Sequence, residues 1–348
     1  MTRLVPPAVV ALLAALLLGA ALGGSTPGSP GLAPPALDAE VARRGSALVA
    51  RNNRIWTSDE AGQFHEAARA VDGGAVQDPA WHPDGQRFAY TVFPPAPTPV
   101  PGVGQPRIGV SEIWQANRGG AAHPIARPDG DEVRLGQTAW QADGSAIYYT
   151  RGEIVRRGGE IAGQRRRVER LALATQERTI LADPGASPAV SPDGRLLAYV
   201  DASGDAPALW LIDLTTGQRR RATDGRFADV VNPSFSPDGR TIAFGGAPRM
   251  GASADRVPDA TDRLVRWLAP RAYAHGPPFT IWLLHPSNLA LDQLGDFVFD
   301  GPSPRWLDAT ALLVQDELAL YRVDLRSLGR TTLNQAEGVT GFDWAPRR

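Results

Sequence analysis

One short pattern, repeated along the chain, constrains the fold more than any other feature of the sequence. In its clearest form it reads Ser191-Pro192-Asp193-Gly194 and is followed by the apolar run Leu196-Leu197-Ala198-Tyr199. Proline restricts φ, aspartate accepts hydrogen bonds from its own backbone, and glycine tolerates positive φ, so Pro-Asp-Gly predicts a tight turn between two short strands. An aromatic or β-branched residue, here called the anchor, precedes the turn in each copy. The six anchors are Trp81, Trp140, Val190, Phe235, Trp306 and Trp344, of which the last two belong to degenerate copies.

A second series alternates with the anchors along the whole chain. Its members each start a short apolar segment 19–26 residues before the next anchor: Ile55-Trp56, Ile113-Trp114, Arg170-Leu171, Leu209-Trp210, Ile281-Trp282 and Leu320-Tyr321. Six alternations indicate six units of about four short strands. One such sheet cannot bury its two faces alone, and radial stacking of units of about 40–45 residues is typical of a propeller. The sequence therefore predicts an all-β fold, a six-bladed β-propeller over residues 45–348.

The two ends of the repeat predict how the ring closes. The last copy supplies only an inner strand around Trp344, and we expect the other strands of that sheet at residues 47–50, 55–57 and 64–70. A ring closed by strands from both ends leaves no exposed sheet edge at the closure.

The residues before the repeat have a different composition. Arg3 precedes an unbroken apolar run over residues 8–22, which indicates a signal peptide or membrane anchor at residues 1–24. Residues 25–44 begin with a Gly- and Pro-rich stretch and are predicted to be a tether. We therefore expect an exported protein, periplasmic or extracellular, whose only contact with the membrane is through residues 5–24 if the leader is retained.

The repeat resembles the WD40-like Pro-Asp repeat of TolB-type propellers, whose usual core reads Trp-Ser-Pro-Asp-Gly followed by Ile-Ala-Phe. The resemblance extends over about residues 45–348 and is closest at Phe235-Ser236-Pro237-Asp238-Gly239 with Ile242-Ala243-Phe244. It implies export, a six-bladed propeller and a protein-binding role.

Composition excludes several classes of function. The net charge of −1 argues against nucleic acid as a partner. The chain has neither cysteine nor lysine, which excludes disulfides, thiolate catalysis, cysteine metal sites and Schiff-base chemistry. The five histidines, His65, His82, His123, His275 and His285, show no metal-binding spacing, and no hydrolase or phosphate-binding motif is present.

Stretches that lengthen a unit beyond the usual length of about 40–45 residues, here called surplus stretches, predict where partners bind. Within a four-stranded blade, the connections between the second and third strands all lie on one rim of the ring. The surplus stretches, residues 93–107, 151–167 and 245–278, are connections of this kind, and loops on a rigid scaffold often carry binding residues. The candidates for rim interaction are Arg156, Arg157, Arg165, Arg166, Arg167 and Trp267. Arginine forks suit carboxylates and phosphates, although a solvated hairpin and simple packing of Trp267 are the alternatives.

The central channel is the second place where a ligand is expected. Asp78 and Asn232 each precede a proline near an anchor and are the candidates for binding at the channel mouth. We expect a non-catalytic, monomeric protein without cofactor or metal that binds another protein or cell-envelope component through its rim. The alternative is a propeller enzyme, of the lactonase or glycan-processing type, with a metal held by several carboxylates or imidazoles at the channel mouth.

Overall fold

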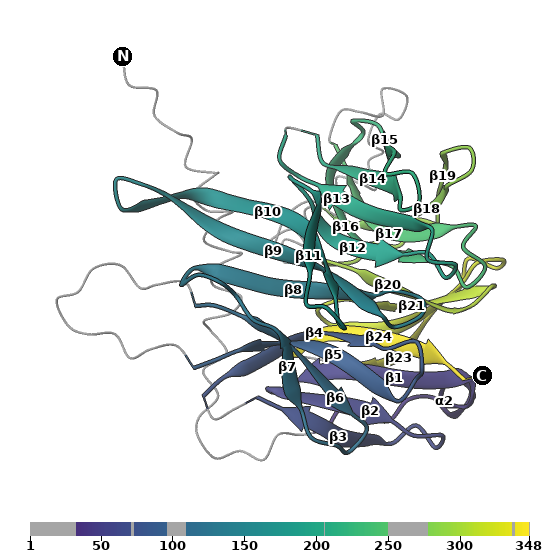
Figure 1. Ribbon diagram of the computed structural model, residues 1–348. Coiled ribbons are helices and arrows are strands. Elements are labelled where there is room, and N and C mark those ends of the chain that lie inside the picture. The colour runs from purple at the N-terminus through teal and green to yellow at the C-terminus, as the bar shows by residue number, and fades with distance from the viewer. Residues whose placement is uncertain are drawn as a thin grey trace.

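Each copy of the repeat forms the inner strand of one sheet in a six-bladed β-propeller (Figure 1). The computed structural model describes residues 33–70, 73–95, 109–204, 206–249, 278–335 and 338–347. Within them the chain forms six four-stranded antiparallel sheets and one short helix. The predicted fold class is confirmed.

The strands of the six sheets follow one another from the inside of the ring outwards. The closing sheet contains β24 (Val339–Pro346), β1 (Gly45–Arg51), β2 (Arg54–Ser58) and β3 (Phe64–Arg69). The next contains β4 (Ala75–Trp81), β5 (Arg87–Phe93), β6 (Glu112–Asn117) and β7 (His123–Ala126). It is followed by β8 (Val133–Trp140), β9 (Ala146–Arg157), β10 (Glu160–Ala172) and β11 (Arg178–Ala182).

The remaining three sheets have the same order. They are β12 (Ala186–Val190), β13 (Leu196–Asp201), β14 (Ala208–Asp213) and β15 (Arg219–Arg221); β16 (Phe227–Phe235), β17 (Ile242–Pro248), β18 (Thr280–His285) and β19 (Ala290–Gln293); and β20 (Ser303–Asp308), β21 (Ala311–Gln315), β22 (Ala319–Asp324) and β23 (Arg330–Gln335). Because the strands alternate in direction, the turns after the first and third strands lie on one rim and the other connections on the opposite rim. We call these the turn rim and the loop rim.

The turn chemistry read from the repeat is present in the structure. The Ser191 hydroxyl donates to Asp193 Oδ1 (2.6 Å) and accepts from the backbone N–H of Leu196 (2.9 Å), while Gly194 has φ +71°. Ser236 and Asp238 repeat the first bond at 2.6 Å. These local bonds fix the turn rim.

The tryptophan anchors join neighbouring sheets. Trp81, Trp140 and Trp306 each place the apolar ring in the core, and the indole N–H donates to a backbone carbonyl of the preceding sheet. Trp140 Nε1 lies 3.1 Å from the Ala80 oxygen, Trp306 Nε1 lies 2.9 Å from that of Ser234, and Trp81 Nε1 lies 3.1 Å from that of Ser46. A large apolar ring with one polar atom suits this position, which explains the recurrence of tryptophan there.

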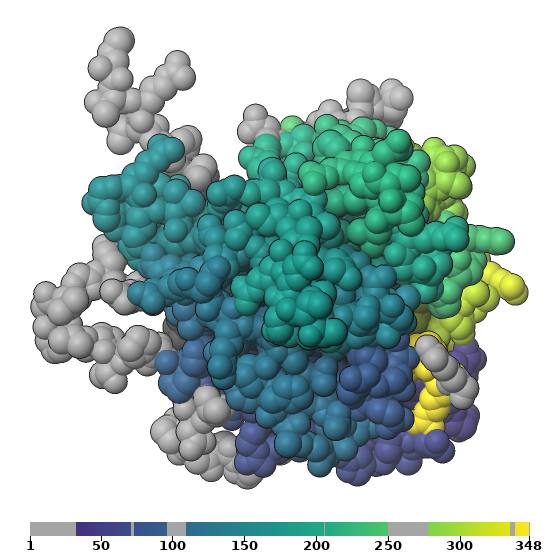
Figure 2. Space-filling view, viewed as in Figure 1, coloured from purple at the N-terminus to yellow at the C-terminus, as the bar shows by residue number. Residues whose placement is uncertain are grey.

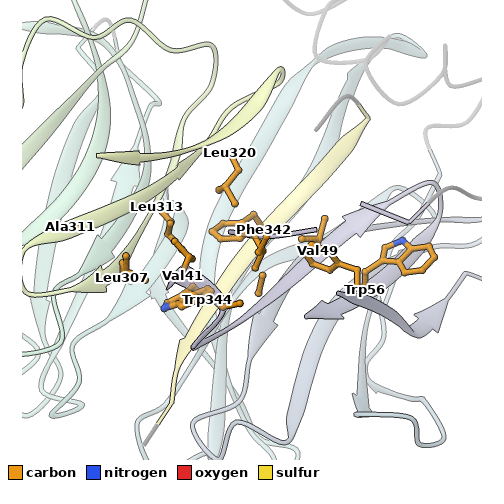
Figure 3. Packing of buried hydrophobic residues seen from close by; sticks show 13 residues of the cluster. Val41, Val49, Trp56, Leu307, Ala311, Leu313, Leu320, Phe342 and Trp344 are labelled. Carbon is orange, nitrogen blue, oxygen red and sulfur yellow. The ribbon is translucent and has the colours of Figure 1, made fainter. Parts of the chain in front are cut away.

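The closing sheet pairs β24 with β1, which lie at opposite ends of the described chain. Phe342 stands opposite Val49 and Trp344 opposite Ala47. Figure 3 shows Phe342 and Trp344 packed with Val49 from the same sheet and with Leu307, Leu313 and Leu320 from the neighbouring one. Strands β1 and β2 contain the expected ranges 47–50 and 55–57, and β3 covers the expected range 64–70 except for Ala70.

The end of the stretch assigned as a tether is folded. Leu37 is buried, and helix α2 (Ala39–Arg44) follows with Asp38 as its N-cap; the side chain of Asp38 accepts from the backbone N–H of Glu40 at 2.8 Å. Val41 and Ala42 belong to the core of the closing sheet. The leader itself lies outside the described residues, and within those residues no helix has the length and apolarity needed to cross a bilayer.

Candidate functional site

The most prominent feature of the loop rim is the hairpin formed by the ends of β9 and β10. β8 pairs with β9 only as far as Glu153, and beyond that point residues 154–164 form a paired ribbon that projects from the body of the ring (Figures 1 and 2). The stretch 151–167 is predicted to be a connection, whereas in the structure it forms continuous strands joined at Gly158 and Gly159. The pair Arg170-Leu171 accordingly lies at the end of β10 rather than at its start.

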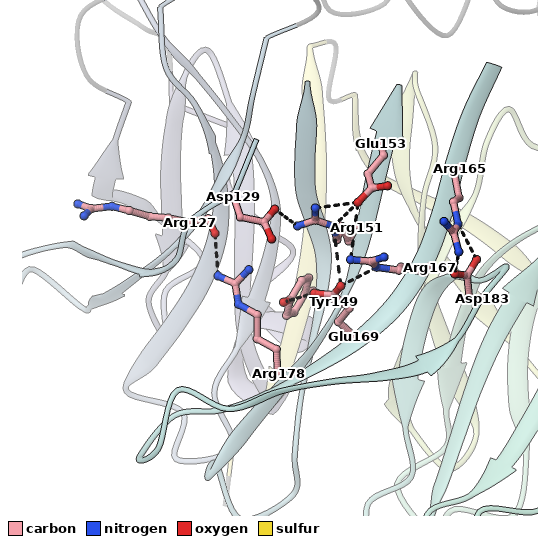
Figure 4. A network of polar contacts seen from close by, with 10 residues as sticks. All are labelled: Arg127, Asp129, Tyr149, Arg151, Glu153, Arg165, Arg167, Glu169, Arg178 and Asp183. Carbon is pink, nitrogen blue, oxygen red and sulfur yellow. Dashed lines mark hydrogen bonds and ion pairs between the residues drawn. The ribbon is translucent and has the colours of Figure 1, made fainter. Parts of the chain in front are cut away.

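A buried ionic network fixes the base of this hairpin (Figure 4). The side chain of Arg151 is only 7% exposed, and its Nη2 lies 2.7 Å from Glu153 Oε1. Arg167 Nε donates to Glu169 Oε1 at 2.7 Å, and the Tyr149 hydroxyl donates to Glu169 Oε2 at 2.6 Å. Burial, together with the hydrogen bond to Glu169, raises the pKa of the Tyr149 hydroxyl. Paired charges of this kind are costly to break because one partner would stay buried alone.

The structure brings the five predicted arginines onto one hairpin but gives them different roles. Arg156 donates to Glu132 (Nε to Oε2, 2.8 Å), Arg165 donates to Asp183 (Nε to Oδ1, 3.1 Å), and Arg167 belongs to the network at the base. Arg157 and Arg166 form no ion pair with the described residues. Residues 151–167 contain six arginines and two glutamates, so the hairpin carries a positive net charge.

A groove lies between this hairpin and the next sheet. It has a volume of about 370 Å³ and is lined by Gln164, Arg165, Arg166, Pro184, Gly185, Ala186, Val200, Ala202 and Ser203. Its floor comes from small and apolar residues, and its wall from β10. A Cβ atom on Gly185 would lie 2.9 Å from the Cβ of Ala182 and 3.1 Å from the ring of Tyr199, so only glycine allows the chain to pass this closely over the core beside the groove.

One further carboxylate belongs to this rim. Burial raises the pKa of Asp229 in β16, while the backbone N–H of Val230 and the positive charge of Arg166 oppose the shift. Arg166 therefore acts electrostatically on a second sheet as well as on its own.

The central channel brings the other two predicted residues together. The residues three positions before each anchor line one cavity of about 70 Å³: Asp78, Gln137, Ser187, Asn232, Ser303 and Gly341. Asp78 and Asn232 lie inside β4 and β16 rather than at their starts. Both have positive φ, +48° and +50°, and each falls in an irregularity of the pairing with the next strand.

Hydrogen bonds connect this ring from sheet to sheet. Asp78 Oδ2 accepts from the backbone N–H of Gln137 (3.2 Å), and Asn232 Nδ2 donates to the hydroxyl of Ser303 (3.0 Å). Burial raises the pKa of Asp78, although the N–H of Gln137 and the hydroxyl of Thr91 lower it. The described residues contain no group of three or more histidines and carboxylates close enough to hold a metal ion. Ligand binding by Asp78 and Asn232 stays a prediction.

The sequence analysis missed a cleft on the turn rim. It has a volume of about 690 Å³ and lies between the closing sheet and the next, over Trp81, His82 and Trp344. The guanidinium of Arg118 stacks on Trp81, 4.5 Å from the ring centroid. Arg118 follows β6 and carries no repeat signal, so only the side-by-side arrangement of β4, β5 and β6 in one sheet reveals its place over Trp81.

Two of the predicted loop elaborations cannot be placed. Residues 96–108 and 250–277, which include Trp267, lie outside the described residues. The part of the second stretch up to Pro248 continues β17.

The fold defines the class of protein as a six-bladed propeller, and comparisons with solved structures agree. TolB from Acinetobacter baumannii matches with a TM-score of 0.61 and 17% identity, over 87% of this chain and 67% of that one. A chain of a nidogen–laminin complex matches with a TM-score of 0.60 and 14% identity, over 86% and 98% of the two chains. A putative TolB from Agrobacterium tumefaciens matches with a TM-score of 0.53 and 15% identity, over 86% and 91%.

These likenesses confirm the resemblance to TolB-type propellers at the level of the fold. No family model matches the sequence, and no curated protein sequence matches it.

Proposed function

We propose that this chain is an exported, non-catalytic propeller that binds another protein of the cell envelope through its loop rim. The observation that carries the proposal is the β9–β10 hairpin, a rigid ribbon with a positive net charge that projects from the ring. A buried ionic network holds its base, so the ribbon is presented in one orientation at little entropic cost on binding. The same fold occurs in a complex between two proteins, nidogen and laminin, and in TolB.

Charge-reversal variants on the two rims test the proposal. The loop-rim variant Arg157→Glu/Arg165→Glu reverses two exposed charges of the hairpin. The turn-rim variant Arg195→Glu/Arg240→Glu reverses two exposed arginines on the opposite rim and serves as the matched control. Thermal unfolding establishes that both variants fold.

Each protein is immobilised and challenged with solubilised envelope fractions of its own source organism. We expect one or more envelope proteins to be retained by the wild type and the turn-rim variant but lost by the loop-rim variant. Retention of the same proteins by all three would contradict the proposal. Cell fractionation of the full-length chain tests export, and recovery with the cytosol would contradict that part.

A further inference from the structure

One edge of the projecting hairpin has no strand beside it. Strand β11 pairs with β10 only from Leu171 to Val168, and then turns away at Asp183 and Pro184. The last backbone hydrogen bond along this edge, among the described residues, is donated by the N–H of Gly185 to the carbonyl oxygen of Arg166 at 2.9 Å. Among the described residues, no strand continues beside residues 160–165 of β10.

The backbone groups of alternate residues at this edge point away from β9. Successive residues in a strand direct their N–H and C=O groups to opposite edges. Since the carbonyl of Arg166 points to the outer edge, the N–H and C=O of Gln164 point there as well. An edge of this kind is a template for another strand, and extended peptides bind many sheets in this way.

The groove beside this edge has the shape and charge for such a strand. Its floor of Gly185, Ala186, Val200 and Ala202 leaves room for small apolar side chains, and its wall carries Arg165 and Arg166. Arg166 has no acidic partner within ion-pair distance among the described residues. A second copy of this hairpin would bring like charges together, so charge complementarity favours an acidic segment of another protein.

We propose that the outer edge of β10 accepts an extended acidic segment of a partner protein as an added strand. The proposal rests on the protein-binding function argued above and specifies how the partner is held. Main-chain bonds to Gln164 and neighbouring residues provide the pairing, and alternate side chains of the added strand lie on opposite faces: the apolar ones enter the groove, and the carboxylates meet the arginine that β10 presents on the other face.

The test uses a fluorescent peptide of alternating glutamate and valine, and a second peptide of the same sequence with every peptide nitrogen methylated. Methylation keeps the charge and removes every N–H donor. Two protein variants accompany the wild type: Gln164→Pro removes the outward N–H, and Gln164→Ala keeps it. Proline at this position is compatible with an edge strand because its missing N–H faces away from β9.

Fluorescence anisotropy at low salt is expected to show binding of the unmethylated peptide to the wild type and to Gln164→Ala. Methylation, and separately Gln164→Pro, should each weaken binding by about tenfold, the effect of losing one or two backbone hydrogen bonds. Equal binding of the two peptides, or equal binding to the two variants, would show an electrostatic contact only and overturn the proposal. Absence of binding of the unmethylated peptide to the wild type would also overturn it.

The two proposals fail in different ways. If the envelope protein is lost by the loop-rim charge variant but retained by Gln164→Pro, the rim binds a partner and strand addition is wrong. If the loop-rim charge variant retains everything, the proposed function itself is wrong. Binding of phosphatidylglycerol vesicles instead of the peptide would assign the hairpin to a membrane surface and overturn strand addition.

Discussion

The variant Gly341→Ala tests the close contact between the inner strands β24 and β4. A Cβ atom at this position would lie 2.5 Å from Cδ of Pro79 and 2.8 Å from the backbone nitrogen of Asp78. Both neighbours are part of β4, which is held in place by its pairing with β5. The two inner strands would therefore have to separate to admit one methyl group.

The magnitude follows from two opposing contributions. Overpacking of a fixed site costs about 1–3 kcal/mol, and the upper half of that range applies because backbone and ring atoms have to move. Replacing glycine by alanine also restricts the unfolded chain, which raises the unfolding free energy by about 0.4–1 kcal/mol. The expected net loss of unfolding free energy is about 1–2.5 kcal/mol. With an unfolding entropy of about 2.1 cal/mol/K per residue over about 300 folded residues, the melting temperature should fall by about 2–4 °C.

Urea unfolding followed by tryptophan fluorescence provides the assay. The midpoint should fall while the slope m stays constant, because the surface exposed on unfolding does not change. The matched control is Gly163→Ala in β10, where an added Cβ meets no atom within 4 Å. This control should be neutral or slightly stabilising. A Gly341→Ala variant within about 0.5 kcal/mol of the control would refute the close approach of β24 and β4.

Three further predictions concern the core, the channel and one turn. Phe342→Ala should lower the unfolding free energy by about 3–5 kcal/mol in urea titrations, because the ring is 3% exposed in the closing sheet; a loss below 1 kcal/mol would contradict that packing. Asp78→Asn should raise the unfolding free energy at neutral pH, since the raised pKa of Asp78 means that its ionised form opposes folding. The gain should disappear in unfolding experiments below about pH 3.8, where the carboxyl is protonated in both states. A lower unfolding free energy of the variant at neutral pH would contradict this assignment. Burial lowers the pKa of His82, so the unfolded chain takes up a proton first and the wild type should lose stability as the pH falls below 6.5. His82→Ser should remove this loss of unfolding free energy. Unfolding free energies that fall equally for variant and wild type would show that other groups cause the loss.

Much of the architecture was predictable because its signals are local. Turn formation at Asp193 and Gly194 depends on hydrogen bonds between residues at most five apart and on one positive φ. The anchors Trp81, Trp140 and Trp306 recur because this position suits a large ring with a donor that reaches the preceding sheet. Six repetitions of a local signal leave few folds that satisfy all of them.

The candidate site was less predictable because its contacts are not local. The surplus residues 151–167 indicated an elaboration on the loop rim, yet the sequence did not show that it continues two strands. The acids that pair with its arginines, Glu132 and Asp183, lie in other connections. The turn-rim cleft depends on Arg118, which reaches Trp81 across the sheet and follows no repeat.

The sequence by itself determined the number of sheets, the order of their strands and the positions of their tight turns, since these follow from spacing and from the backbone preferences of proline, aspartate and glycine. The tertiary structure alone decided which charges are neutralised, which strand edge stays open and which channel residues meet. Those properties depend on distances between different strands and sheets, and neither residue spacing nor local conformational preference specifies such distances.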